Sequence, residues 1–540
     1  MNEILLKGGQ IYDGTGRKPY TADLLIRGDR IAKIGRDLAV SGSAVSFNLD
    51  GLSVTPGFID IHRHCDKEPL LPKNENRPGY GSVLLRQGIT SVVTGNCGIS
   101  MYPLNPDSSA ADQMRSYYAP VLGDIAPFKK IVNYEAYLKD LGKVSLPVNT
   151  GSMIGMGAVR IAVKGFSDAP FTLREIRQCQ EIISTALSQG ALGVSIGLMY
   201  LPECWETPEE LGEILKPLGR KGRILTTHIR GEGDSLVKSI EEVLKIAEIA
   251  GCRLEISHFK SCGIRNWGTT LRKAIRLIED ARSAGQDVSC DFYPYNCGST
   301  TLMSLVPPQF VNGDIRQALQ KLQTETGLRE FRSLLGQTFP DWDNYAVSLG
   351  LDRVVLSAVS CEENRPLLGQ NITQIARTRC QGDEAAALAE LLVSENGAAA
   401  AIIQSMDAAD VDTVAALPYS LLISDAIYAD TDCPHPRMFG AFPHFLHDFS
   451  VKRKLLPLSK AIAKMTKMPA LRMGIQERGE IKEGYFADLN VFDPDHFCDH
   501  ADYTAPLELA SGLDYCFVNG KLTVRNDCVL SEENGLLLKA

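Results

Sequence analysis

The sequence predicts an α/β protein: a (β/α)8 TIM-like barrel, a small β-sandwich domain built from both chain termini, and an insertion before the last barrel strand. Three observations support this fold class. The chain of 540 residues is too long for one ordinary domain. Its middle alternates strand and helix patterns, and both ends read as short strands.

The two ends of the chain are predicted to form the β-domain, over residues 1–55 and 480–540. Residues 23–35 contain two β-rich runs around Gly28-Asp29, which is a hairpin signal. Near the other end, residues 487–492 are a strand candidate, and Asn519-Gly520 separates two apolar runs. Neither end alone has enough strands for a stable core, so we expect the two ends to pair.

Residues 56–479 are predicted to form the barrel. Capping boxes that start at Thr172 and Thr207 open two helices. Strands are expected over 191–197, 223–228, 253–258 and 287–292, with helices between them. Such βα units give parallel strands, and a barrel is favoured over a doubly wound sheet because no Gly-rich phosphate fingerprint follows an early strand.

Residues 302–406 do not show this alternation of strand and helix patterns and are dominated by charged helical stretches such as 314–335. We interpret them as an insertion that serves as a lid. Two ordinary barrel units are the alternative interpretation.

Composition excludes several classes of protein. A net charge of -9 argues against a nucleic-acid partner, because phosphate binding needs a basic surface. No apolar run is long enough for a membrane span, and the N-terminus lacks a signal-peptide layout. The 14 cysteines are scattered without a CxxC pair, which indicates reduced thiols in a cytoplasmic protein.

Four of the nine histidines lie at expected strand ends: His62, His64, His228 and His258. His62 and His64 stand two residues apart in a strand, so their side chains project to the same side. Because the carboxyl ends of barrel strands meet at the active site, we expect these imidazoles to bind a metal ion.

Two further residues end expected strands. Cys97 follows the run 91–96, where a thiolate would suit zinc and a buried, inert thiol is an equal alternative. Asp425 closes the apolar run 420–424, and a carboxylate there must be solvated, paired or metal-bound. From position alone Asp425 is a candidate metal ligand, general base or both.

These motifs, in their order along most of the chain, resemble the N-acyl-D-amino-acid deacylase (D-aminoacylase) branch of the amidohydrolase superfamily. The motifs are PGFIDIHRH from Pro56, TGNCG ending at Gly98, GLMY ending at Tyr200, THIRGEGD from Thr227, EISHFK ending at Lys260, DFYPY from Asp291, the pair Ser424-Asp425, and HPRMFGAFP from His435. The ordered set is specific, although each piece alone is weak.

The resemblance implies zinc-dependent hydrolysis of the amide bond of N-acyl-D-amino acids, a small-molecule substrate class, to a carboxylate and a free D-amino acid. It implies a tight zinc site at Cys97, His228 and His258, and a second, weaker metal position at His62, His64 and Asp425. Asp425 is expected to transfer the proton as catalytic residue. The residues implied to hold the substrate carboxylate are Tyr200, Lys260, Tyr293 and Arg437, with Ser299 nearby.

Two alternatives stay open at this point. The first is a hydrolase of a cyclic amide, of the hydantoin or dihydropyrimidine type, or of a dipeptide. Cys97 argues against it, and Lys164 is the only nearby candidate for the bridging lysine of such enzymes. The second is an inactive barrel kept as a scaffold, which the complete set of six candidate ligands argues against.

Overall fold

Eight parallel strand positions form the central barrel in the computed structural model, which describes residues 3–39, 44–72, 79–312, 314–340 and 342–540. In hydrogen-bonded order they are β6 (Phe58–Asp60), β7 (Ile89–Thr94), β8 (Asn149–Ser152) continued by β9 (Ile154–Gly155), β10 (Gly193–Gly197), β11 (Ile224–His228), β12 (Arg253–Ile256), β13 (Val288–Phe292) and β17 (Ser420–Leu422). A parallel bridge between Arg63 and Ala426 joins β17 to β6 and completes the ring.

Helices surround these strands, because each helix has one apolar face that it buries. They include α5 (Leu173–Ser188), α6 (Pro208–Ile214), α8 (Leu236–Ala250) and α9 (Thr270–Ser283). The expected capping boxes are present: Thr172 with Glu175 opens α5, and Thr207 with Glu210 opens α6. The strands between them are almost wholly buried, as strands of a parallel barrel are.

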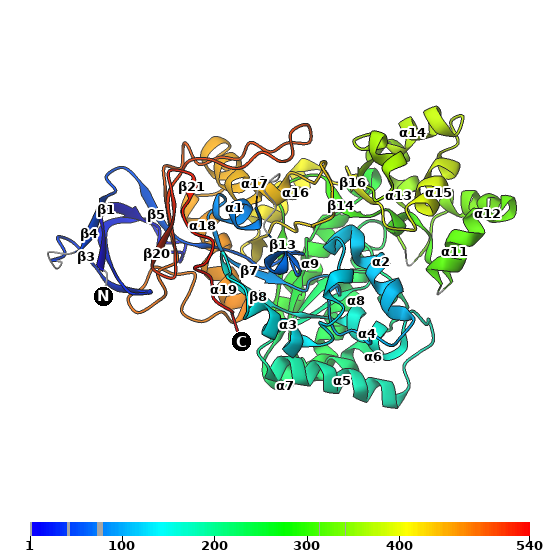
Figure 1. Cartoon of the computed structure of the whole chain (residues 1–540), viewed down its shortest axis with the longest axis horizontal. Coiled ribbons are helices and arrows are strands. Elements are labelled where there is room, and N and C mark those ends of the chain that lie inside the picture. The colour runs from blue at the N-terminus through cyan, green and yellow to red at the C-terminus, as the bar shows by residue number, and fades with distance from the viewer. Residues whose placement is uncertain (1–2, 40–43, 73–78, 313, 341) are drawn as a thin grey trace.

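Both ends of the chain share one nine-stranded sheet (Figure 1). Its strands are β1 (Glu3–Ile11), β2 (Tyr20–Arg27), β3 (Arg30–Gly35), β4 (Val45–Asn48), β5 (Ser53–Pro56), β18 (Leu489–Phe492), β19 (Leu513–Val518), β20 (Lys521–Arg525) and β21 (Cys528–Val529). The two ends meet where β5 pairs antiparallel with β18. The sheet bends over one core that contains Leu24, Val54, Leu489 and Phe517, so the expected pairing of the termini is confirmed.

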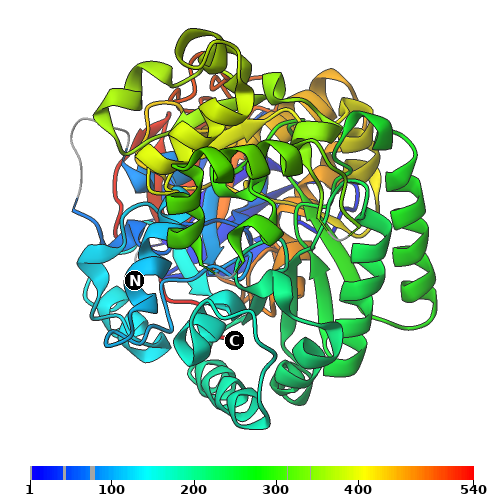
Figure 2. The same cartoon turned by 90° about the vertical axis from the view of Figure 1, so that its right-hand side faces the viewer.

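An insertion separates β13 from β17. It contains a three-stranded antiparallel sheet of β14 (Gly298–Thr301), β15 (Val354–Ala358) and β16 (Ala400–Ile403). Its helices include α11 (Ile315–Leu322), α12 (Glu325–Leu335), α14 (Ile372–Arg379) and α15 (Glu384–Ser394), which project at the end of the molecule opposite to the β-domain (Figure 1, Figure 2). Because these strands pair with one another and not with the barrel, the alternative of two ordinary barrel units is wrong.

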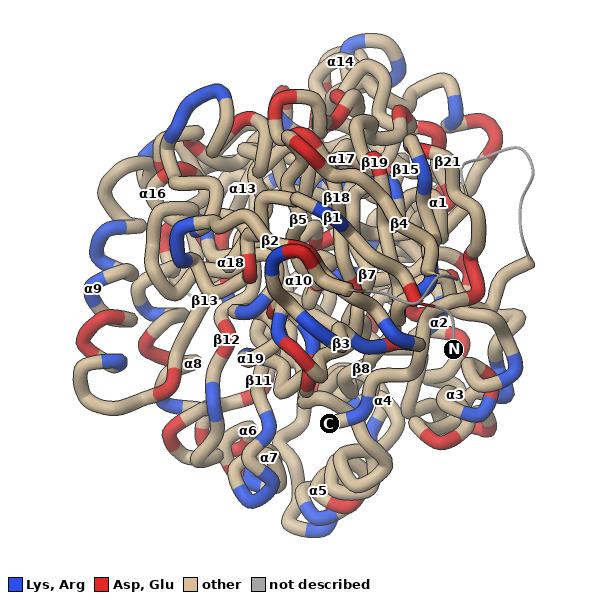
Figure 3. The backbone as a smooth tube through the Cα atoms, turned by 90° about the vertical axis from the view of Figure 1, so that its left-hand side faces the viewer, with Lys and Arg blue, Asp and Glu red and all other residues tan. Residues whose placement is uncertain are grey.

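Three further features of the structure concern its cysteines, its helices and its surface charge. All 14 cysteines lie in the described part of the chain and are free thiols. Among the described residues, no helix is both long and apolar enough to cross a lipid bilayer. Basic and acidic segments are interspersed on the face that carries the β-domain (Figure 3).

Candidate metal centre

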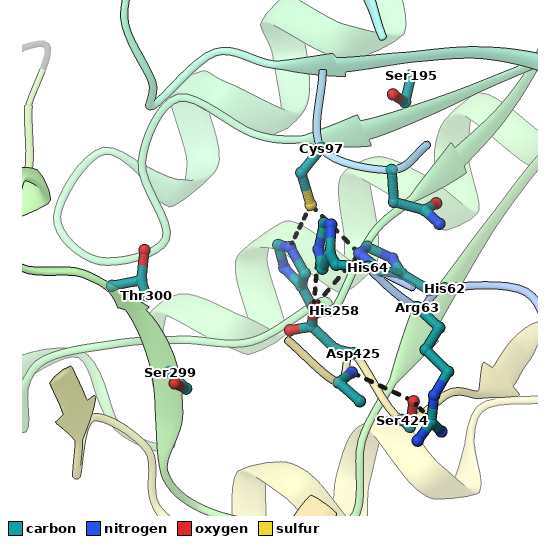
Figure 4. A network of polar contacts seen from close by, with 12 residues as sticks. His62, Arg63, His64, Cys97, Ser195, His258, Ser299, Thr300, Ser424 and Asp425 are labelled. Atoms are coloured by element: carbon teal, nitrogen blue, oxygen red, sulfur yellow. Dashed lines mark hydrogen bonds and ion pairs between the residues drawn. The ribbon is translucent and has the colours of Figure 1, made fainter. Parts of the chain in front are cut away.

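All six candidate ligands lie together at the carboxyl ends of the barrel strands. His62 and His64 follow β6, Cys97 follows β7, His228 ends β11, and the remaining two, His258 and Asp425, follow β12 and β17. All six side chains are buried. Figure 4 shows five of them converging on one point.

The shortest contacts in this cluster connect sulfur, imidazole nitrogen and carboxylate oxygen. Cys97 Sγ lies 3.2 Å from His62 Nε2 and 3.5 Å from His258 Nε2. Asp425 Oδ1 lies 3.4 Å from His62 Nε2 and 3.5 Å from His64 Nε2. These distances make His62 common to two groups that could each hold a metal ion, one with Cys97 and His258 and one with His64 and Asp425.

His228 belongs to a third such group, with Glu232 and His258. Its ring centroid lies 4.4 Å from that of His258, and its Nε2 lies 3.3 Å from Met199 Sδ. Among the described residues, none of the three groups contains both Cys97 and His228, so the zinc triad that the resemblance implies, Cys97, His228 and His258, is not one of them, and the shortest thiol contact is with His62.

Left-handed backbone conformations direct three of these side chains. Cys97, His258 and Asp425 have φ values of 55°, 36° and 50°. Residues with a Cβ rarely adopt such values, and each costs about 1–3 kcal/mol that the surrounding fold must offset. The same strained geometry at the ends of three separate strands indicates that the fold holds these side chains in place for a function.

The donor set fits zinc. Zinc binds imidazole nitrogen, thiolate sulfur and carboxylate oxygen, and all three are present here. His64 Nδ1 and His228 Nδ1 are buried and have no hydrogen-bond partner among the described residues. Burial lowers the pKa of His62 to about 4 and also lowers that of His258, so their imidazoles are neutral, which is the form that binds metals.

Two carboxylates, Glu232 and Asp291, contact the histidines. Glu232 Oε1 lies 3.0 Å from His258 Nδ1 and also pairs with Lys260. Asp291 Oδ1 accepts a hydrogen bond from the backbone of His258, and its Oδ2 lies 3.6 Å from His62 Nδ1. Carboxylates in such positions orient metal-binding imidazoles.

Sequence reasoning missed Glu232 as a functional residue. Its only signal was its place in THIRGEGD, four residues after His228. Burial opposes its ionisation, but Lys260 and the neighbouring histidines outweigh burial and hold the pKa of Glu232 far below its usual range.

A second missed residue, Arg63, fastens β6 to β17. Its buried guanidinium donates to Asp60 Oδ2 at 3.2 Å, Ser424 Oγ at 3.1 Å, Tyr428 Oη at 2.7 Å and the carbonyl oxygen of Met438 at 2.8 Å. Figure 4 shows Arg63 pointing away from the cluster, toward Ser424. The network therefore fixes the chain on both sides of His62, His64 and Asp425 without entering the site.

The residues expected to hold a substrate carboxylate lie beside the cluster. Two cations lie near the ring of Tyr293: Lys260 Nζ is 5.6 Å and Arg437 Cζ is 4.5 Å from its centroid. Arg437 Nη1 lies 2.9 Å from Asp425 Oδ2, and Arg437 Nη2 donates to the carbonyl oxygen of Ser299 at 3.4 Å.

A cavity with an empty volume of about 570 Å³, part of it open to solvent, connects these residues to the cluster. Tyr200, Lys260, Tyr293 and Ser299 line it, together with Cys97, His228, His258 and Asp425. Tyr200 shares a hydrogen bond of 3.2 Å with Thr300 across the cavity wall, and its ring centroid lies 4.6 Å from that of His228. Arg437 lies behind Asp425 and is not part of this lining.

A barrel with imidazole, thiol and carboxylate groups gathered at its strand ends defines a metal-dependent hydrolase of the amidohydrolase class. A family model described as "Amidohydrolase family" matches residues 391–523. The chain is 33% identical to a D-aminoacylase of Alcaligenes xylosoxydans xylosoxydans, over 99% of this chain and 97% of that protein. It is 31% identical to an N-acyl-D-aspartate deacylase of the same organism, over 99% and 95% of the two chains.

A solved structure gives the same result. The N-acyl-D-glutamate deacylase of Bordetella bronchiseptica, complexed with zinc and a phosphonate inhibitor, superimposes with a TM-score of 0.81 at 29% identity and covers 99% of both chains. The protein therefore belongs to the D-aminoacylase (N-acyl-D-amino-acid deacylase) family of the amidohydrolases.

Proposed function

We propose that this protein is a zinc-dependent hydrolase of the amide bond of N-acyl-D-amino acids and releases a carboxylate and a free D-amino acid. The observation that carries the proposal is the arrangement of two kinds of group in one cavity. A buried imidazole, thiol and carboxylate cluster lies next to Lys260 and Tyr293, and Arg437 lies directly behind it. The cluster suits amide hydrolysis, and the cations suit an α-carboxylate.

In this proposal Cys97, His228 and His258 hold the tightly bound zinc ion, and His62, His64 and Asp425 hold the weaker position. Cys97 and His258 are in direct contact, and His228 packs against His258. Zinc bound there would polarise the scissile carbonyl and lower the pKa of a water molecule.

Asp425 moves the proton. Burial opposes its ionisation, but Arg437 and the neighbouring histidines outweigh burial and hold its pKa well below the usual range, so it is a carboxylate at neutral pH. It can accept a proton from the attacking water and then donate it to the departing amine. Its position at the end of β17, fixed by the Arg63 network, keeps it next to His62 and His64.

The substrate carboxylate is held by Lys260, Tyr200, Tyr293 and Arg437 in this proposal. Lys260, Tyr200 and Tyr293 line the cavity and Arg437 lies behind Asp425, so ammonium, guanidinium and phenol groups near the cluster provide charge-assisted and neutral donors together. Fixing the carboxylate and the amide leaves the two hands of the α-carbon to differ in where the side chain points, so selectivity for D-substrates also requires a cavity wall that accepts the side chain in one of the two positions.

Cyclic-amide hydrolysis has less support. Lys164, the only nearby candidate for a bridging lysine, ends α4 (Met156–Lys164), and its Nζ donates to the carbonyl oxygens of Ala169 at 2.7 Å and Pro170 at 2.8 Å. It is not among the described residues that line the cavity beside the candidate ligands.

The test is amine release by purified, zinc-loaded protein from matched N-acetyl-D- and N-acetyl-L-amino acids, with and without a chelator. We expect turnover of the D-series alone, and we expect the chelator to abolish it. Turnover of a hydantoin or a dihydropyrimidine without turnover of either N-acetyl series would contradict the proposal.

A further inference from the structure

We propose that the side-chain part of this cavity accepts neutral, apolar D-amino acids and rejects those with an acidic side chain. This inference rests on the proposed function. The relatives reported above include a D-aminoacylase, whose name specifies no side chain, and deacylases of N-acyl-D-aspartate and N-acyl-D-glutamate, at 29–33% identity, so similarity does not decide between neutral and acidic substrates. The residues that line the cavity distinguish between the two classes.

Apart from the candidate metal ligands, the lining of the cavity is largely apolar. It combines Ile99 after β7, Val121 on α2 (Ala110–Leu122), Met199 after β10, Ile427 after β17 and, from the insertion, Ile403 at the end of β16. Tyr345 adds an aromatic ring from α13 (Tyr345–Ser348), also in the insertion. Besides the candidate metal ligands and Lys260, the other lining residues are the uncharged Gly298, Ser299, Thr300 and Ser405, the tyrosines Tyr200 and Tyr293, and Glu232, which pairs with Lys260.

Among the described residues that line the cavity, Lys260 is the one cation. It is buried and already paired with Glu232. Arg437, immediately behind the lining, is buried and paired with Asp425 at 2.9 Å. Each of the two cations therefore already faces an anion of the protein, and both lie near the ring of Tyr293.

A substrate with an acidic side chain brings two carboxylates. The α-carboxylate competes for Lys260 and Arg437, and the second carboxylate meets isoleucine, valine and methionine side chains. Burying a carboxylate there without a partner is unfavourable, whereas an apolar side chain gains from losing contact with water. We expect kcat/KM for N-acetyl-D-methionine to exceed that for N-acetyl-D-aspartate and N-acetyl-D-glutamate by at least about 100-fold.

The first experiment measures these three kcat/KM values on the zinc-loaded wild-type protein. Inhibition constants of the products D-methionine and D-aspartate give a binding readout that does not depend on turnover of an acidic substrate. A ratio near one, or a preference for an acidic substrate, would overturn the specificity inference and leave the proposed function intact. Absence of turnover for every N-acetyl-D-amino acid would instead overturn the proposed function.

A matched pair of variants tests whether the lack of a free cation in the lining causes this preference. Ile427 is half-buried, so a longer side chain at this position can reach the mouth of the cavity. Ile427→Lys adds a cation to the lining, and Ile427→Met adds a chain of similar length without charge. We expect Ile427→Lys to reduce the methionine-to-aspartate ratio by at least tenfold, and Ile427→Met to change it by less than about threefold. Equal effects of the two variants would show that shape, and not charge, sets the preference.

Discussion

Replacing Arg63 by methionine tests whether its buried network, an ion pair with Asp60 and hydrogen bonds to the β17 side, holds the metal centre together. Arg63 is completely buried and makes four hydrogen bonds, to Asp60, Ser424, Tyr428 and Met438. Methionine fills part of the space but leaves the Asp60 carboxylate buried without its cation. Breaking a buried pair in this way costs about 3–5 kcal/mol. We also expect weaker zinc binding, because His62 and Asp425 are joined by a backbone hydrogen bond of 2.9 Å next to this network.

The assay is urea unfolding followed by tryptophan fluorescence, together with zinc competition against a chelator. A double variant, Arg63→Met with Asp60→Asn, removes both charges and should be less destabilised than the sum of the two single variants. Arg329→Met is the control, because Arg329 pairs with Glu325 on the exposed surface of α12 and should contribute little. A loss below about 1 kcal/mol in Arg63→Met, with unchanged zinc affinity, would refute the reasoning.

Three other substitutions have distinct expected results. Asp425→Asn should retain zinc at the tight site and lower kcat by at least about 100-fold, and wild-type kcat in this variant would end the proton-transfer role. Lys260→Met should raise KM for N-acetyl-D-amino acids more than it lowers kcat, and an unchanged KM would remove Lys260 from carboxylate binding. Gly98 follows Cys97, has a φ of 72°, and a Cβ at this position would collide with the Glu203 side chain, so Gly98→Ala should lower the amount of bound zinc measured by elemental analysis. Full zinc content in this variant would show that the turn tolerates the change.

Strand ends made much of the site predictable. His62, His64, His228, His258 and Asp425 each close a recognisable apolar strand pattern, and barrel topology brings such ends together. The direction of the Cys97 side chain could not be derived in the same way. It depends on a left-handed backbone at φ 55° in the TGNCG turn, which strand periodicity does not describe.

The features that could not be predicted from the sequence depend on contacts between residues far apart in the chain. Strand-like alternation through residues 62–64, just after β6, predicts that Arg63 points to the side opposite to His62 and His64, where a charged residue suggests solvent. Only the fold brings Tyr428 and Ser424 to it. In the insertion, β15 and β16 pair antiparallel across 41 intervening residues, from Ala358 to Ala400, so no hairpin turn signals them. The boundaries predicted for the domains, at residues 55, 302, 406 and 480, stay predictions.

Bound zinc in Cys97→Ala, compared with Cys179→Ala, tests the central claim most directly. Both cysteines are buried, but Cys179 lies on α5, outside the three possible metal groups of the described residues. We expect Cys97→Ala to lose the tightly bound zinc and the hydrolysis of N-acetyl-D-amino acids, and Cys179→Ala to keep both. Full zinc content and activity in Cys97→Ala would contradict a metal centre built around this thiolate.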